Sequence, residues 1–175
     1  MDFSIDAALQ ADHDRLRAFV RDEIVPLEAD RKNYDSYGNI DMAVLQTLRA
    51  KVKAAGLWAP QIPREQGGLG YEPTGMAVLY EAMNYSIFGP VAFNCAAPDD
   101  GNMYILNKVA NQAQKDRWLT PIINGDVRSS FAMTEPAPGG GSDPSMIQTT
   151  AKRVNGKWVI NCLLYTSPSP RDLSE

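Results

Sequence analysis

The spacing of hydrophobic residues in the first part of the chain predicts helices. From Ile5 to about Arg31, apolar positions recur every three or four residues, as they do on one face of an amphipathic helix. Asp41 is a residue type that caps helix N-termini, so a second helix is expected to follow it and to stop at Gly56. His13 is expected on the polar face of the first helix, as a surface residue.

Three shorter helices are expected further along the chain. Pro73 opens the first of them, which runs through Met83 and follows a loop rich in Gly and Pro. The next begins near Gly101. The last covers 112–119 and is expected to end at Pro121, because proline breaks the interior of a helix.

The pattern changes after the last of these helices. Residues 129–133 are short and apolar, and Asn155-Gly156 between β-favouring residues is a strong signal for a two-residue hairpin turn. A helical domain over 1–125 is therefore expected to give way to a β-domain that starts over 126–161. The predicted class is α+β: an all-α N-terminal domain followed by the first strands of an incomplete antiparallel β-barrel-like domain, too few to close a barrel.

Composition and charge narrow the functional class. The chain is 44% hydrophobic and 22% charged, as ordinary globular proteins are, and its net charge of −4 gives no basic field for nucleic acid. No apolar run is long enough to cross a bilayer, and no secretory or transit signal is visible. Cys95 and Cys162 form neither a disulfide framework nor a metal cluster, so no metal site is expected and a cytoplasmic setting is the default.

The most distinctive stretch is FAMTEPAPGGGSDP, which runs from Phe131 to Pro144. Its glycines lack the Lys of a nucleotide P-loop and the third glycine of a Rossmann turn. Glycine lets backbone come close to a ligand, and successive N–H groups bind anions. A strand end and loop that hold a flat ligand and a phosphate therefore fit the pattern. From the residues alone, a flexible surface loop fits it equally well.

Several motifs, in order along the chain, resemble the flavin-dependent acyl-CoA dehydrogenases. That family's Thr-Glu-Pro signature, with its glycine loop, strand and hairpin, is similar to FAMTEPAPGGGSDPSMIQTTAKRVNGKWVIN. Its upstream loop resembles GLWAPQIPREQGGLG, and one subgroup, related to vertebrate members associated with a kinase-like domain, resembles FNCAAPDDGNM. The resemblance covers nearly all of 1–161, although the loop after Pro136 is longer than the family's compact form.

The resemblance implies FAD as cofactor and an acyl-CoA thioester as substrate. In that family a carboxylate takes the α-proton and the flavin N5 takes a hydride from Cβ. The implied cofactor contacts are Phe131, Ala132, Met133 and Thr134 along the flavin ring, with Gly141 and Ser142 beside the pyrophosphate or the thioester arm. The implied substrate contacts are Ser142, Ala97 and Asp100. Asp100 is expected to face solvent or cap the helix at Gly101, or else to meet a polar group of the substrate.

The resemblance assigns no catalytic residue within this chain, because the family's catalytic glutamate lies in a later domain. The chain by itself is therefore expected to be inactive, and Glu135 is expected to have a structural role, as a cap or a buried hydrogen-bond acceptor. The implied partners are acyl-CoA, an electron-transfer flavoprotein, and further copies of the chain in a homo-oligomer. A mitochondrial or peroxisomal setting is implied if the source is eukaryotic.

Two other interpretations stay open. An acyl-CoA oxidase or flavin monooxygenase of the same fold would use O2 in place of an electron carrier. A non-catalytic helical interaction module would bind no flavin at all.

A different origin is expected for 162–175. One reading frame of a transposase-adapter sequence, used in preparing sequencing libraries, encodes Cys162 to Asp172 without interruption. Segments that come from such sources carry no information on the fold. The sequence therefore predicts that the match to natural protein stops at Asn161 and that 162–175 are a translated sequencing-adapter tail.

Sequencing the source template across codon 160 tests this origin. We expect the codons for Ile-Asn to be followed by Gly and then by a Trp-x-Thr or Trp-x-Ser segment, as in the family. A template that encodes Leu173-Ser174-Glu175 and then a stop codon would show instead that the tail is natural.

Overall fold

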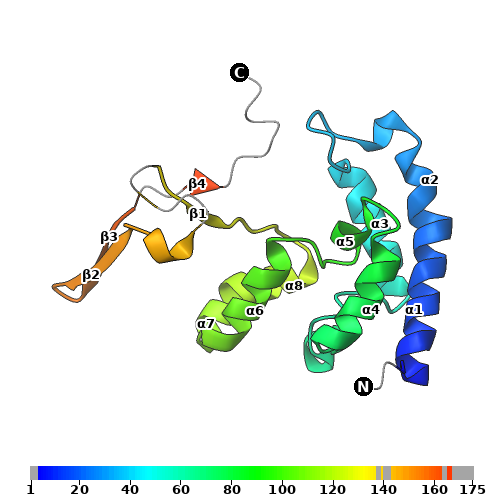
Figure 1. Ribbon diagram of the computed structural model, residues 1–175, viewed down its shortest axis with the longest axis horizontal. Helices are drawn as coiled ribbons and strands as arrows, with labels where there is room; N and C mark the ends of the chain where they lie inside the picture. The colour runs from blue at the N-terminus through cyan, green and yellow to red at the C-terminus, as the bar shows by residue number, and fades with distance from the viewer. Residues whose placement is uncertain (1–3, 137–138, 140–142, 163–164, 167–175) are drawn as a thin grey trace. The chain divides into compact units, whose positions relative to one another are not determined.

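The computed structural model describes residues 4–136, 139, 143–162 and 165–166 (Figure 1). The chain divides into two compact units, Met1–Arg128 and Ser129–Glu175. The first unit is helical and the second contains the strands, which confirms the α+β class. The domain limits expected from the sequence, at 125 and 161, stay predictions. Among the described residues, no helix is both long enough and apolar enough to cross a membrane.

The first helical stretch is continuous but changes its hydrogen-bond register. Asp6 caps α1 (Ala7–Phe19) by accepting from the N–H groups of Ala8 and Leu9, at 3.0 and 2.9 Å. The α-helix then passes into a π-helical segment, η1 (Val20–Ile24), and on into α2 (Val25–Glu28).

A second continuous helix contradicts the expected end at Pro121. α7 (Gln112–Gln114), the π-helical segment η4 (Lys115–Leu119) and α8 (Thr120–Asn124) follow one another without a break. The residue before Pro121 donates its N–H five residues back, to Lys115, as the residue before Pro26 does to Val20. A wider π turn relieves the clash between a proline ring and the preceding turn, so the helix continues through each proline.

The remaining helices agree with the sequence pattern except at one place. Asp41 caps α3 (Met42–Ala54), with its carboxylate accepting at 2.9 and 3.3 Å, as predicted. α4 (Pro73–Met83) has the expected limits, and α6 (Asp99–Val109) begins slightly earlier than expected. The sequence pattern missed α5 (Gly89–Ala92), a single turn that carries only two buried residues. Short 3₁₀ turns join these elements at η2 (Arg31–Asn33) and η3 (Arg64–Gln66).

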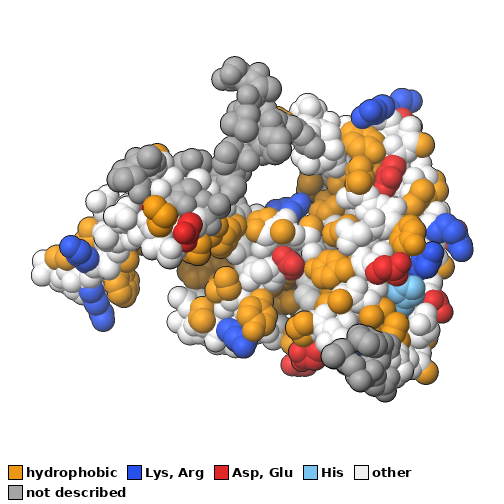
Figure 2. Space-filling view, viewed as in Figure 1, with side chains coloured by type: hydrophobic (Ala, Val, Ile, Leu, Met, Phe, Trp, Pro, Cys, Tyr) orange, Lys and Arg blue, Asp and Glu red, His pale blue; other side chains and the backbone are white. Residues whose placement is uncertain are grey.

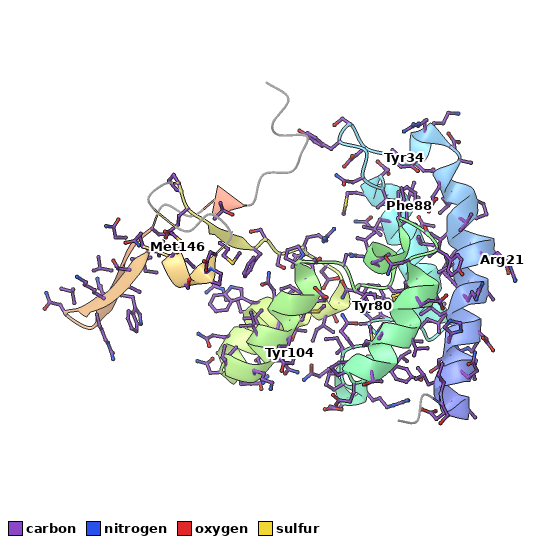
Figure 3. All side chains as sticks on the ribbon, in the orientation of Figure 1. Arg21, Tyr34, Tyr80, Phe88, Tyr104 and Met146 are labelled. Carbon is purple, nitrogen blue, oxygen red and sulfur yellow. The ribbon has the colours of Figure 1, made fainter. Side chains whose placement is uncertain are left out.

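One apolar core holds the helical unit together. α1 lies beside α4, and α3 contacts α5 (Figure 1). Aromatic contacts add to this core. The ring centroids of Phe19 and Phe93 lie 5.7 Å apart, with the rings edge to face. Those of Tyr34 and Phe88 lie 4.9 Å apart (Figure 3). Side chains with almost no exposed surface fill the centre, and they include Leu16, Ile24, Leu45, Leu48, Val52, Leu57, Leu79, Met83 and Met103.

His13 is buried, which corrects the expectation of a surface residue. It is 8% exposed and lies on the same face of α1 as Leu9 and Leu16, so the helical period places it toward the core. Its Nε2 is 2.8 Å from Oε2 of Glu81 on α4, and its Nδ1 is 3.1 Å from Oδ1 of Asp14. The hydrogen bond to Glu81 is the main cause that raises the pKa of His13, and burial opposes it.

Side chains from elsewhere in the helical unit bind the last carbonyl groups of α8. Trp58 Nε1 donates to the carbonyl of Ile123 at 2.9 Å, and Lys53 Nζ donates to that of Asn124 at 2.7 Å. The last carbonyls of a helix have no partner within it, so these donors satisfy them where the helix end packs against α3 and the segment after it.

Gly125 completes this arrangement. Arg49 Nη1 donates to its carbonyl at 2.9 Å, and Asn94 Nδ2 reaches the carbonyl of Ile122 at 3.0 Å. Gly125 has φ +75°, and a Cβ there would lie 2.8 Å from the ring of Trp58. Only glycine therefore suits both the backbone conformation and the space at this position.

The second unit contains a regular β-hairpin. β2 (Thr150–Val154) pairs antiparallel with β3 (Lys157–Asn161) along their whole length. Asn155 and Gly156 have φ of 49° and 77°, the left-handed values that a type I′ turn requires, so the predicted hairpin is confirmed. Hydrophobic and basic side chains lie exposed together on this hairpin (Figure 2).

Replacing Gly125 with alanine tests the capped end of α8. We expect Gly125→Ala to lower the free energy of unfolding by about 1 to 3 kcal/mol, because the new Cβ meets Trp58 and the left-handed backbone is strained. Gly101→Ala is the control, since a Cβ at that helical position meets nothing within 4 Å; it should be neutral or stabilising by up to about 1 kcal/mol. Urea unfolding followed by circular dichroism measures both, and equal stability of the two variants would contradict the capping argument.

The buried imidazole predicts a specific pH dependence. Because the folded-state pKa of His13 is raised, its contribution to stability is complete below about pH 6.5, the ordinary value, and is lost as pH rises through the folded pKa. His13→Gln should remove this component from the difference between stabilities measured at acid and alkaline pH. His13 is the chain's one histidine, so an NMR titration reads its pKa directly. A value at or below the ordinary one would refute the prediction.

Candidate functional site

The sequence-predicted flavin contacts lie at the start of the second unit. β1 (Ala132–Thr134) is a short extended segment, and Phe131 precedes it directly. Phe131 and Ala132 are exposed, Met133 is half-buried, and Thr134 is buried. The segment therefore presents apolar side chains and backbone at one end and a buried hydroxyl at the other.

β1 has a partner strand with an irregular register. It pairs antiparallel with β4 (Tyr165–Thr166), with Ala132 opposite Thr166 and Thr134 opposite Tyr165. The register shifts between these two positions, so Met133 lies at the irregularity. β4 falls within the stretch for which the sequence predicts an adapter origin.

The carboxylate of Glu135 follows β1 and is almost fully enclosed. Glu135 is 6% exposed, and its Oε2 accepts from the N–H of Gln148 at 2.6 Å. Its Oε1 accepts from the N–H of Thr149 at 2.7 Å and from the Thr149 hydroxyl at 2.5 Å. Both oxygens thus bind the chain just before β2, the structural role that the sequence analysis expected.

These donors also decide the charge of Glu135. The hydrogen bond from Gln148 is the main cause that holds the pKa of Glu135 below its ordinary value, followed by the contacts of Thr149. In the part of the chain that the structure describes, no cation pairs with this carboxylate. Glu135 is therefore ionised at neutral pH, and hydrogen bonds stabilise its charge. Because both of its oxygens already accept hydrogen bonds, a role in acid–base catalysis is disfavoured.

The glycine-rich stretch has one described glycine, and its neighbour is Glu135. A Cβ on Gly139 would lie 2.4 Å from Oε2 and 2.5 Å from Cβ of Glu135. The N–H of Gly139 also donates to the carbonyl of Pro136 at 2.8 Å. The missing side chain of Gly139 therefore makes room for Glu135 of the same chain, and not for a bound ligand. The predicted contacts Gly141 and Ser142 lie outside the described residues.

The predicted substrate contacts lie in the helical unit. Ala97 is exposed, and Asp100 is half-buried in the first turn of α6. Asp100 Oδ1 accepts from the N–H of Gly101 at 2.7 Å, and the hydroxyl of Tyr80 donates to its Oδ2 at 3.3 Å. Asp100 thus lies inside the first turn of α6, whose N-cap residue is Pro98 and whose start has no side-chain cap, so the expected cap at Gly101 is not formed and a contact with the substrate stays a prediction.

Tyr80 is a residue that the sequence analysis missed. Its hydroxyl also donates to the carbonyl of Cys95 at 2.8 Å, and the side chain points from α4 toward the connection between α5 and α6 (Figure 3). The thiol of Cys95 is buried and donates to Gln61 at 3.1 Å. Burial raises the pKa of this thiol, so Cys95 is a packed residue and not a nucleophile.

An ion pair between a buried carboxylate and an exposed guanidinium lies where the chain leaves the helical unit. Asp99, 2% exposed, bonds to the guanidinium of Arg128. Arg128 also donates to the carbonyl of Ala97 at 3.4 Å. No sequence signal pointed to this pair, because its members lie 29 positions apart and in different predicted domains.

The chemistry along β1 suits a flat ligand with a polar edge. Exposed apolar surface at Phe131 can cover an aromatic ring, and the Thr134 hydroxyl and the strand backbone supply hydrogen-bonding groups. The charge of Glu135, the described carboxylate that follows this strand, is already satisfied by hydrogen bonds, which weakens its repulsion of an electron-rich ligand. The described residues therefore fit a flavin ring.

Comparisons with known proteins show the family of the chain. The family model for the acyl-CoA dehydrogenase N-terminal domain matches residues 7–126. "Acyl-CoA dehydrogenase family member 10" of Mus musculus is 36% identical over 156 residues, which cover 85% of this chain and 14% of that protein. "Probable acyl-CoA dehydrogenase FadE2" of Mycobacterium tuberculosis is 37% identical over 171 residues, which cover 92% of this chain and 40% of that protein.

Solved structures give the same result. A Mycobacterium abscessus structure assigned to the acyl-CoA dehydrogenases has a TM-score of 0.77 and 35% identity, over 91% of this chain and 42% of that one. A glutaryl-CoA dehydrogenase from Mycobacterium smegmatis in complex with FADH2 shares the fold alone, with a TM-score of 0.61 and 18% identity over 90% of this chain and 38% of that one. The family match spans more than half of the chain. The chain belongs to the acyl-CoA dehydrogenase family, whose members are FAD-dependent.

Proposed function

We propose that this chain is part of an FAD-dependent enzyme that dehydrogenates an acyl-CoA thioester between its α and β carbons. The observation that carries the proposal is β1, an extended segment with exposed apolar groups and a buried hydroxyl, followed by a carboxylate that already accepts three hydrogen bonds, in a chain of this family. Bound FAD would supply the oxidising group. The chain spans less than half the length of the relatives described above, so activity, substrate and partners are proposed for the complete protein.

The chain's own residues would bind and orient the flavin. Phe131 and Ala132 would cover the ring, and the backbone of Met133 and Thr134, with the Thr134 hydroxyl, would bond its polar edge. Donors fixed at that edge stabilise negative charge that builds up on reduction. Gly141 and Ser142 are proposed to lie by the pyrophosphate or the thioester, and Ala97 and Asp100 by the acyl chain.

The partners follow from the same proposal. An electron-transfer flavoprotein would accept electrons from the complete enzyme, which would assemble as a homo-oligomer. A cytoplasmic setting, or an organellar one in a eukaryote, stays a prediction. No residue of this chain is proposed as the base that removes the α-proton, so the chain alone should not turn over acyl-CoA.

Two alternatives differ in what they predict for the flavin. In an oxidase or monooxygenase of this fold, reduced flavin would reoxidise quickly in air. In a non-catalytic helical module, no yellow cofactor would be present even in the complete protein. Dehydrogenation linked to an electron carrier predicts instead a bound flavin that acyl-CoA bleaches and that recovers slowly in air.

Thr134 provides the direct test of the flavin-binding strand. In the complete protein, Thr134→Val should weaken FAD binding by roughly two- to tenfold, the worth of one lost hydrogen bond. Thr150→Val is the matched control, because Thr150 is exposed on β2 and should leave FAD affinity unchanged. Flavin fluorescence during FAD titration measures both.

Absence of FAD from the complete wild-type protein, or measurable acyl-CoA turnover by the 175-residue chain alone, would contradict the proposal. Equal FAD affinities for the Thr134 and Thr150 variants would remove Thr134 from the site.

A further inference from the structure

Glu135 makes contacts that flavin binding does not by itself require. We propose that Glu135 is a positioning residue that ties the chain before β2 to the end of β1, and so fixes the two ends of the loop over 136–147. Its consequence for the cofactor rests on the proposed function, because Thr134 precedes Glu135 directly. The tie itself is independent of any ligand.

The tie requires a carboxylate and not only a polar side chain. The N–H groups of two consecutive residues, Gln148 and Thr149, point at different oxygens of Glu135, at 2.6 and 2.7 Å. The Thr149 hydroxyl adds a third donor at 2.5 Å. Glutamine at position 135 would turn one acceptor oxygen into an NH2 donor, which would face an N–H donor and break at least one of these bonds.

The near end of the loop folds over the same carboxylate. Gly139 donates to the carbonyl of Pro136 at 2.8 Å, and its α-carbon packs against Glu135 with no room for a Cβ. One side of the Glu135 side chain thus contacts the start of the loop, and its two oxygens hold the end. Glu135 therefore contacts the start of the loop at Gly139 and its end at Gln148 and Thr149.

The far part of the loop has its own local cap. Asp143 Oδ1 accepts from the N–H of Ser145 at 2.9 Å and from the Ser145 hydroxyl at 2.7 Å. This contact spans two residues and starts the 3₁₀ turn η5 (Pro144–Met146), whereas the contacts of Glu135 span 13 and 14 residues. Asp143 organises a turn, and Glu135 closes the loop.

The contacts of Glu135 suit a positioning residue and not a catalytic base. A carboxylate that serves as a base needs an oxygen free for the proton that it takes. Both oxygens of Glu135 accept from backbone N–H groups, and the residue is almost fully enclosed. The same donors lower its pKa, so the tie should open only when acid protonates the carboxylate.

The experiment is an NMR titration of the 175-residue chain, followed at the amides of Gln148 and Thr149. In the wild type, both amide resonances should shift together as pH falls through a pKa below about 4.3, the ordinary value for glutamate. In Glu135→Gln this shared titration should vanish, and exchange of both amides with solvent should quicken by roughly tenfold.

Asp143→Asn is the matched control. It should alter the Ser145 amide and leave the Gln148 and Thr149 amides as in the wild type. Wild-type amides that do not titrate with a shared pKa, or a Glu135→Gln variant with unchanged exchange at both, would overturn the proposal. Because the wild-type titration needs no variant, it decides the matter even if Glu135→Gln fails to fold.

A second measurement tests the consequence for the cofactor. In the complete protein, Glu135→Gln should bind FAD roughly tenfold more weakly, while Glu65→Gln, at an exposed position of η3, should bind it as the wild type does. Lost amide protection with unchanged FAD affinity would overturn the link to the cofactor. A wild-type protein without FAD would overturn the proposed function and leave the amide result standing, so the two failures are distinct.

Discussion

The helical unit depends on how the carbonyl end of α8 is satisfied. Helix C-termini carry unpaired carbonyls and partial negative charge, and here that end packs against other elements. Lys53 and Arg49 from α3, with Trp58 and Asn94 from the connections, supply the donors. Two of the four are cations, whose charge also favours this end of the helix dipole. One set of hydrogen bonds thus joins α3, two loops and α8.

That constraint determines where the chain leaves the helices. Gly125 turns the backbone under Trp58, and Arg128 then pairs with buried Asp99 at the start of α6. Burial lowers the pKa of Arg49, and the nearby charge of Arg128 adds to this effect while Asp99 opposes it. The second unit uses the converse arrangement: one carboxylate, Glu135, collects backbone N–H groups. In both units a few enclosed polar groups fix the backbone path of a connecting segment, which apolar contacts alone do not fix.

Local signals predicted the elements that depend on neighbouring residues. The helical period, the Asp41 cap and the Asn155-Gly156 turn each act within a few positions, and the structure has all three. The expectations for Pro121 and His13 were wrong for physical reasons. A π turn accommodates the proline, and position 13 falls on the apolar stripe that continues from Leu9. The partners of Glu135 and Asp99 are set by tertiary structure, so no sequence spacing could indicate them.

A structure of the complete protein with FAD bound tests the central claim most directly. We expect the flavin ring to lie along 131–134, with the Thr134 hydroxyl and strand backbone at hydrogen-bonding distance, about 2.7–3.2 Å, from its polar edge. In that structure Glu135 should still accept from the N–H groups of Gln148 and Thr149. A flavin bound away from this strand, or a Glu135 carboxylate turned toward the substrate, would show that β1 and Glu135 do not have these roles.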